Sequence, residues 1–185
     1  MSRRPRFTPL RRLPRDQGGA TAIEFALIAP IMILLYFGLV EFSQGFMAQR
    51  RASHAASVVS DLIAQSERTS RAGIDAVFAV GGLIMRPFPA SELSVRASSI
   101  AVDANGKATV EWSHGNGKAL APLQRDDPIS DLPSDVVEKE QTIIMGETEY
   151  VYQSPFAAVL PKPVTLSRRY FLRPRTVDRV VCTDC

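Results

Sequence analysis

Glu24 is the residue whose type and position most suggest chemistry, because it is the only acidic or basic side chain between residues 20 and 40. That run reads ATAIEFALIAPIMILLYFGLV, and about 20 mostly apolar residues suffice to cross a bilayer. A carboxylate inside an apolar span is costly and usually has a partner or a function. Two interpretations stay open: Glu24 pairs with another group, or it lies near enough to the end of the span to reach the lipid headgroups.

The two cysteines, Cys182 and Cys185, lie in the sequence Val-Val-Cys-Thr-Asp-Cys. A structural zinc ion needs about four ligands, and no second pair of Cys or His residues supplies the rest. A redox Cys-x-x-Cys pair accompanies a βαβ pattern, which is not found around this one. The pair therefore forms either a small local disulfide, if the compartment is oxidising, or two free thiols.

Residues for catalysis are scarce. The chain has two histidines, of which His54 belongs to a solvated helix face and His114 to a turn-like segment, Ser-His-Gly-Asn-Gly-Lys. That segment lacks the spacing of a phosphate-binding loop, and no serine lies in a nucleophile elbow. The sequence Asp126-Asp127-Pro128 predicts a turn. We expect no enzymatic activity, no metal and no cofactor.

Positive charge is concentrated before the apolar run. The whole chain has a formal net charge of +3. Residues 1–19 hold six arginines and one aspartate, so residues 20–185 carry 16 basic and 18 acidic side chains, a net charge of −2. A nucleic-acid-binding protein would spread its basic residues over a folded surface, so we exclude nucleic acid as a partner. Positive charge flanking a membrane span stays cytoplasmic, which predicts a cytoplasmic N-terminus.

Two other classes of protein share part of this pattern. A cleaved secretory signal also has a basic start, but its apolar region is shorter and ends in a small-x-small site, whereas Phe37-Gly-Leu-Val-Glu-Phe follows here. The core helix of a soluble protein would not explain the six arginines upstream.

The helical pattern continues beyond the apolar run. The Gly18-Gly19 pair is expected to interrupt the chain, and a helix is expected from about residue 20 to about residue 66, some 70 Å at 1.5 Å per residue. Pro30 removes one helical hydrogen bond and predicts a kink. Small and apolar residues at spacings of three and four form a stripe that packs on a domain: Ala48, Ala52, Ala55, Val59 and Leu62.

The remaining residues predict a small α+β domain. We expect a second helix over residues 72–85 and strands over residues 93–102, 107–113, 142–152 and 164–172, with a long loop over residues 115–134. Asn105-Gly106 between two alternating runs predicts a hairpin. The fold class is therefore α+β, with a long N-terminal helix packed on a small antiparallel sheet. Four aromatic residues are expected in the core or the sheet: Trp112, Tyr150, Tyr152 and Phe156.

The start of the apolar run also resembles a known processing motif. This start is similar to the cleavage motif of type IV prepilins. It consists of a basic leader, Gly19, four further residues, and then Glu24 and Phe25 before a long apolar helix. The resemblance implies that prepilin peptidase cuts between Gly19 and Ala20. Cutting there makes Glu24 the fifth mature residue, and cutting after Gly18 would make it the sixth, so Gly19 is the better match. The new amino group of Ala20, with an unperturbed pKa near 8, could then pair with Glu24 of a neighbouring subunit.

Within the pilins, this segment resembles the TadE-like family of tight-adherence pilus proteins. The segment starts Gly-Ala-Thr-Ala-Ile-Glu-Phe and continues to Gly38-Leu-Val-Glu41-Phe. The match covers roughly residues 17–60. The segments Glu149-Tyr-Val-Tyr-Gln-Ser-Pro155 and Arg173-Pro-Arg175 are similar to late segments of such proteins. TadG-type relatives are longer and often carry an Asp-x-Ser-x-Ser adhesion motif, which this sequence lacks.

The resemblance implies a pilin-like protein in four parts: a cleaved cytoplasmic leader over residues 1–19, a transmembrane helix over residues 20–41, its periplasmic extension over residues 42–66, and a periplasmic domain over residues 67–185. It implies a minor pseudopilin of the inner membrane that acts in Flp/Tad type IV pilus biogenesis and adherence. The implied partners are prepilin peptidase, other pseudopilins, the major Flp pilin and the Tad/Cpa assembly machinery. An uncleaved membrane scaffold and an exported soluble protein are the alternatives.

Overall fold

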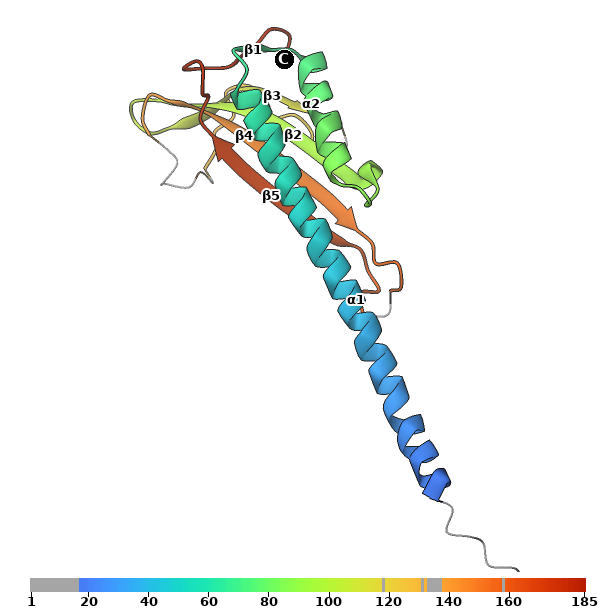
Figure 1. Ribbon diagram of the computed structural model, residues 1–185. Helices are drawn as coiled ribbons and strands as arrows, with labels where there is room; N and C mark the ends of the chain where they lie inside the picture. Colours follow the sequence, from blue (N-terminus) through green and yellow to red (C-terminus); the bar gives the residue numbers. More distant parts are fainter. Residues whose placement is uncertain (1–16, 118, 131, 133–137, 158) are drawn as a thin grey trace, which may run out of the picture.

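The computed structural model describes residues 17–117, 119–130, 132, 138–157 and 159–185. Its longest element is the helix α1 (Gln17–Ala64), which has 48 residues. It begins three residues earlier than predicted, so Gly18 and Gly19 belong to its first turn and do not interrupt it. The predicted leader lies almost wholly outside the described residues. Figure 1 shows that the first half of α1 projects away from the rest of the molecule.

The domain around the second half of α1 has the predicted α+β fold. Its main sheet has four antiparallel strands in the order β3-β2-β4-β5. The bounds are β2 (Leu93–Val102), β3 (Ala108–Gly115), β4 (Thr142–Tyr152) and β5 (Val164–Leu172). Three of these strands have the ends that the sequence predicts, because each is an apolar or alternating run bounded by turn-forming residues.

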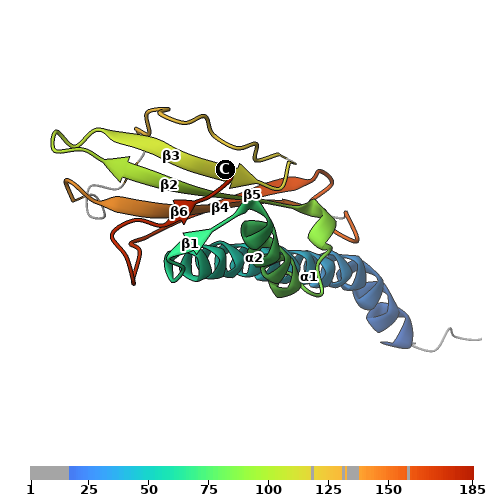
Figure 2. The ribbon, with the colours of Figure 1, turned by 90° about the horizontal axis from the view of Figure 1, so that it is seen from above.

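α1 packs along one face of this sheet, so that helices and strands form two layers (Figure 2). The small residues predicted to form the contact stripe are buried: Ala48, Ala52, Ala55 and Val59. Leu62 is only half-buried, and Ile63 is buried in its place. Strand β4 comes close enough for the Thr148 hydroxyl to donate to the carbonyl oxygen of Ala52, 3.0 Å away.

The second helix, α2 (Arg71–Ile84), lies beside α1 on the same side of the sheet. Its N-terminus is capped by Ser70, whose hydroxyl accepts a hydrogen bond from the backbone N–H of Gly73 at 3.2 Å; such caps stabilise a helix by about 1 kcal/mol. Ile74 and Phe78 of α2 are buried in the core with Ile63 of α1. A short 3₁₀ turn, η1 (Ala90–Glu92), then leads into β2.

The opposite face of the sheet is covered by the long connection between β3 and β4. Leu123, Ile129 and Leu132 of this connection pack against Ile143 and Met145 of β4. The same face holds the buried carboxylate of Glu147. The predicted loop therefore covers this face of the sheet and forms a second apolar core with it.

The hairpin predicted at Asn105-Gly106 joins β2 to β3. The carboxylate of Asp103 accepts the backbone N–H groups of Asn105 and Lys107, each at 2.8 Å, and these donors, first that of Lys107, hold the pKa of Asp103 below its usual value. Gly106 has a φ of +84°, a conformation that glycine adopts without strain.

Two short strands were not predicted. β1 (Arg68–Thr69) and β6 (Val181–Cys182) pair in parallel at the far end of α1. Two-residue strands carry no alternation, so nothing in the sequence marks them. Their pairing fixes the last described residues to the junction between α1 and α2.

Gly146 lets β4 approach α1. A Cβ atom added there would overlap the hydroxyl oxygen of Ser60 and lie 3.0 Å from the carbonyl oxygen of Ala56. We expect Gly146→Ala to destabilise the full-length protein by about 1–3 kcal/mol, as overpacking usually does, in urea unfolding monitored in detergent. The control is Gly45→Ala, whose added Cβ would lie at an ordinary 3.5 Å from the Tyr152 ring. Equal stability of the two variants would contradict this packing.

Candidate membrane-anchoring and processing segment

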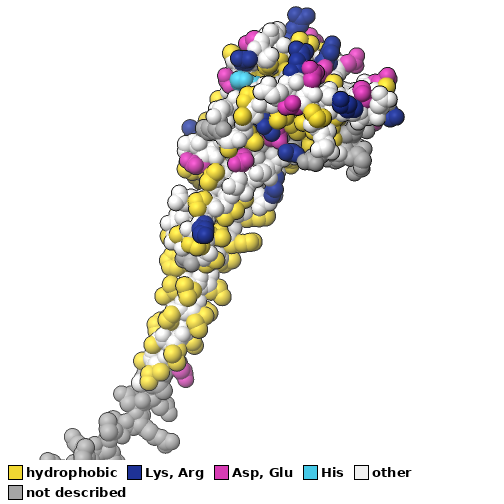
Figure 3. Space-filling view, turned by 180° about the vertical axis from the view of Figure 1, so that it is seen from behind, with side chains coloured by type: hydrophobic (Ala, Val, Ile, Leu, Met, Phe, Trp, Pro, Cys, Tyr) yellow, Lys and Arg dark blue, Asp and Glu magenta, His cyan; other side chains and the backbone are white. Residues whose placement is uncertain are grey.

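The first half of α1 is apolar and exposed. Between Glu24 and Glu41 it carries no acidic or basic side chain. Figure 3 shows it as a projection of hydrophobic side chains below a domain on which the charged groups gather. This projecting part of α1, residues 19–41, is called the stalk. Phe37 and Val40 are half-buried. Most of the stalk's other large apolar residues are at least half exposed: Ile23, Phe25, Leu27, Ile28, Ile31, Met32, Ile33, Leu34, Leu35, Tyr36 and Leu39.

This exposure distinguishes α1 from the core helix of a soluble protein. The most apolar 18 residues of the helix include no buried residue, and α1 is long and apolar enough to cross a membrane. The stretch ends in aromatic and basic groups: the rings of Phe42 and Phe46 are stacked 6.5 Å apart, and the guanidinium of Arg50 lies 5.7 Å from the Phe46 ring centre. Aromatic residues of this kind are enriched at membrane–water interfaces.

The predicted processing residues lie at the end of the stalk that is far from the domain. Gly19 is exposed, and a Cβ atom added to it would meet no atom within 4 Å. The backbone of Ala20 is helical. Glu24 is exposed, and no described residue pairs with its carboxylate. Phe25 is 72% exposed, so the motif is open to another protein.

Pro30 lies inside α1, which continues through it as one helix. The kink predicted there stays a prediction. The residue is exposed among the apolar side chains of the stalk, where bilayer helices tolerate proline.

Glu41 has a structural role that the sequence does not reveal. It is fully buried, although the sequence suggests only that it marks the end of the span. Its Oε2 atom accepts the backbone N–H groups of Val159 and Leu160, each at 2.9 Å. These two residues belong to the loop between β4 and β5, so the carboxylate joins the stalk to a segment 118 residues further along the chain.

Other contacts from this loop surround Glu41. The ring of Phe156 lies 5.1 Å from that of Phe37, and a Cβ on Gly38 would lie 3.3 Å from a Val159 methyl group. Tyr152 is buried nearby, and burial first, then the Glu41 carboxylate, raises the pKa of its hydroxyl. Phe156, which the sequence predicts in the core, is instead 52% exposed, because it lies on the stalk and not in the sheet.

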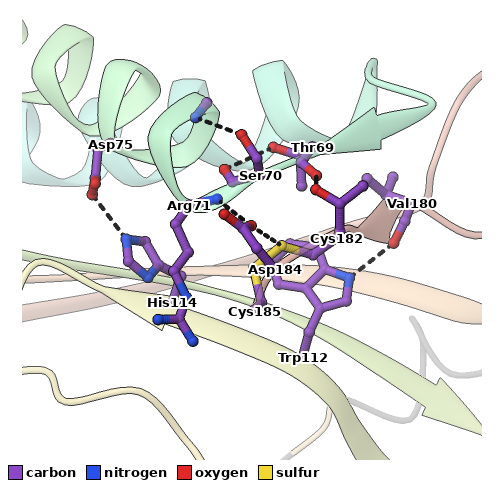
Figure 4. Close-up of a disulfide and its surroundings, with 12 residues drawn as sticks. Thr69, Ser70, Arg71, Asp75, Trp112, His114, Val180, Cys182, Asp184 and Cys185 are labelled. Atoms are coloured by element: carbon purple, nitrogen blue, oxygen red, sulfur yellow. Dashed lines mark hydrogen bonds and ion pairs between the residues drawn. A yellow bond between two sulfur atoms is a disulfide. The ribbon is translucent and has the colours of Figure 1, made fainter.

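The two cysteines lie at the opposite end of the molecule. Cys182 and Cys185 form a disulfide, and Figure 4 shows it beside the start of α2. The Asp184 carboxylate accepts the backbone N–H of Arg71 at 2.8 Å, and the backbone N–H of Thr183 donates to Thr69. The disulfide thus closes the segment that β6 fixes to β1. Its bonded sulfur atoms offer no thiolate to a metal.

The remaining candidates have structural surroundings. His114, expected in a turn, lies at the end of β3, where its Nε2 atom is 2.8 Å from an Asp75 carboxylate oxygen. His54 is exposed on α1. The indole N–H of Trp112 donates to the carbonyl oxygen of Val180 at 2.8 Å, so Trp112 and the buried Tyr150 and Tyr152 belong to the core as predicted.

Comparison with known proteins bears on α1. Residues 19–60 match the family described as TadE-like protein, which confirms the resemblance inferred from the sequence. The match begins at Gly19 and includes Glu24, Pro30 and Glu41. No curated protein and no solved structure matches the chain.

Proposed function

We propose that this chain, which carries a TadE-like segment over residues 19–60, is a minor pseudopilin that acts in the biogenesis of a Flp/Tad type IV pilus. The observation that carries the proposal is the overlap of that segment with α1, whose first half is apolar and mostly exposed. A pseudopilin needs one helix that is stable in lipid before assembly and against neighbouring helices afterwards. A stalk most of whose apolar residues are exposed meets both needs.

The proposed topology follows from charge. Six arginines precede the stalk, which favours a cytoplasmic N-terminus in the inner membrane and a domain on the periplasmic side. The disulfide between Cys182 and Cys185 supports this orientation, because disulfides persist in the oxidising periplasm. The role is structural rather than catalytic, and the partners are the major Flp pilin, other pseudopilins and the Tad/Cpa assembly machinery.

Prepilin peptidase is the enzyme proposed to process the chain, between Gly19 and Ala20. The bond between these two residues lies in the first turn of α1, and a helix must unwind before a peptidase can cut it. The Gly18-Gly19 pair makes unwinding easy, since each glycine costs a helix about 1 kcal/mol relative to alanine. The exposure of Glu24 and Phe25 leaves both side chains free to contact the enzyme.

Cleavage would also give Glu24 a partner. The new α-amino group of Ala20 is a cation at neutral pH, and Glu24 has no ion-pair partner among the described residues of its own chain. In a stack of subunits, the carboxylate of one chain would meet the amine of its neighbour in a medium where unpaired charge is costly. This pair would set the register between subunits.

The test removes the gene and restores it in variant forms, with surface pili and cell adherence as the readout. We expect wild-type protein to restore both, and Glu24→Ala to restore neither, because the amine of the neighbouring chain would be left unpaired. Glu24→Ala should nevertheless be inserted in the membrane at the wild-type level, as immunoblots of membrane fractions would show.

Glu149→Ala is the matched control, since Glu149 is a carboxylate on the sheet, far along the chain from the stalk. It should support piliation. Normal pili in the deletion strain would contradict a role in pilus biogenesis, and normal pili with Glu24→Ala would contradict the pairing of Glu24.

A further inference from the structure

The loop between β4 and β5 has an unusual composition for a surface loop. No charged side chain occurs between Tyr150 and Pro161. Phe156 is 52% exposed and Val159 is 56% exposed, with Ala157 and Leu160 beside them. These four residues are called the apolar tip below. Within the described part of its own chain, nothing covers the outer faces of Phe156 and Val159.

The apolar tip lies alongside the stalk and not beyond its end. Phe156 contacts Phe37, and Val159 contacts Gly38. Both partners belong to the uncharged stretch that ends at Val40. Any membrane that surrounds this part of α1 therefore also meets the apolar tip.

The depth of the tip can be estimated from the helix alone. A hydrocarbon core of about 30 Å takes about 20 helical residues. If the core begins at Thr21, it ends near Glu41, and Phe37 lies about 6 Å inside it. If it begins at Glu24, it ends near Gln44, and Phe37 lies about 10 Å inside. The apolar tip reaches the hydrocarbon in both placements.

Irregular backbone at this depth needs internal partners, because lipid offers no hydrogen bonds. Glu41 provides them by accepting the N–H groups of Val159 and Leu160, and the Ser154 hydroxyl accepts that of Ala157 at 3.4 Å. Three prolines lower the number of donors, since proline has no N–H: Pro155, Pro161 and Pro163. Lys162 is exposed directly after the tip, where its ammonium group can reach lipid phosphates.

We propose that the apolar tip of the β4–β5 loop inserts into the periplasmic leaflet of the membrane beside α1, as a second membrane contact of the domain, with the buried Glu41 satisfying its backbone. This inference rests on the proposed membrane span. It fixes the domain at one height and orientation on the bilayer, which a single helix does not do. On assembly, a neighbouring helix would replace the lipid on the same surface.

The test measures the quenching of tryptophan fluorescence by lipids with brominated acyl chains. Full-length protein is reconstituted in vesicles of phosphatidylethanolamine and phosphatidylglycerol, with and without the brominated lipids. The probes are Phe156→Trp and Val159→Trp. Trp112, buried in the domain at 8% exposure, supplies the background in every sample, and wild-type protein measures it.

Two controls calibrate the depth. Tyr36→Trp lies in the stalk and must be quenched if α1 spans the membrane. Tyr170→Trp replaces an aromatic residue on β5 whose hydroxyl bonds Ser53, and Ser53 lies about 24 Å beyond Phe37 along α1. It should show no quenching.

We expect the probes at positions 156 and 159 to lose a fraction of their emission close to that of Tyr36→Trp. Quenching of Tyr36→Trp with none at either tip position would overturn the inference and leave the membrane span in place. Absence of quenching at all positions would overturn both. Blue-shifted but unquenched tip emission would also overturn the inference, because it would mean that a second copy of the protein covers the tip.

Discussion

In Glu41→Ala, we expect the backbone amides of Val159 and Leu160 to exchange with deuterium at least a hundredfold faster than in the wild type. The Glu41 carboxylate is fully buried and accepts both N–H groups at 2.9 Å. Hydrogen bonds to a charged group contribute about 1.5–3 kcal/mol each, and about 1.4 kcal/mol changes an equilibrium constant tenfold. The measurement is hydrogen exchange of the full-length protein in one detergent, read on peptides covering residues 153–163.

Two variants control this experiment. Glu41→Gln keeps an oxygen acceptor without the charge, so its loop should exchange at an intermediate rate. Gln44→Ala removes a polar side chain from α1 about one turn further on and should leave the loop amides as in wild type. Wild-type exchange in Glu41→Ala would mean that other contacts hold the loop to the stalk.

A second large effect is expected at Glu147, on the face of the sheet away from α1. Its side chain is 4% exposed and lies between two arginines: Oε2 is 2.6 Å from Nε of Arg96, and Oε1 is 2.7 Å from Nε of Arg169. Removing one member of a buried ion pair costs about 3–5 kcal/mol, because the remaining charge is left without compensation. Glu147→Ala should therefore destabilise the protein by about that amount in urea unfolding.

The two arginines give the matched comparison. Arg169 is about half exposed, so water can take the place of its guanidinium beside the Glu147 carboxylate. Arg169→Ala should therefore lower the free energy of unfolding far less than Glu147→Ala does. Arg96 is 13% exposed and also donates to the carbonyl oxygen of Ala121 at 2.7 Å, so its loss should fall between the two. If Glu147→Ala and Arg169→Ala lowered the free energy of unfolding equally, the claim that the buried carboxylate is the centre of this cluster would be contradicted.

Much of the fold could be predicted because its elements are long and periodic. The strand over residues 142–152 is rich in β-branched and aromatic residues, and its ends agree with the structure. The stripe that begins at Ala48 and Ala52 has helical spacing, and it is buried as the spacing predicts. The resemblance at Gly19 and Glu24 depended on local spacing, which a sequence displays directly.

The features that were missed depend on contacts between distant parts of the chain. Glu41 looks like an ordinary polar end of a span until the loop near Val159 is placed beside it. Phe156 looks like a core residue, since a sequence does not show whether an aromatic ring faces a sheet or a membrane-facing stalk. The first turn of α1 includes Gly18 and Gly19 because the long helix that follows outweighs their low helix propensity.

The central claim, that this chain is a processed pseudopilin, is tested most directly by the mass of its N-terminus. The protein is extracted from membranes of cells with and without prepilin peptidase, beside Gly19→Ala and Gly18→Ala variants. We expect a mature chain that begins at Ala20 in cells with the peptidase, for wild type and Gly18→Ala. Cleavage should be lost in Gly19→Ala and in cells without the peptidase. An intact Met1 N-terminus in every sample would contradict the claim and favour the uncleaved membrane scaffold.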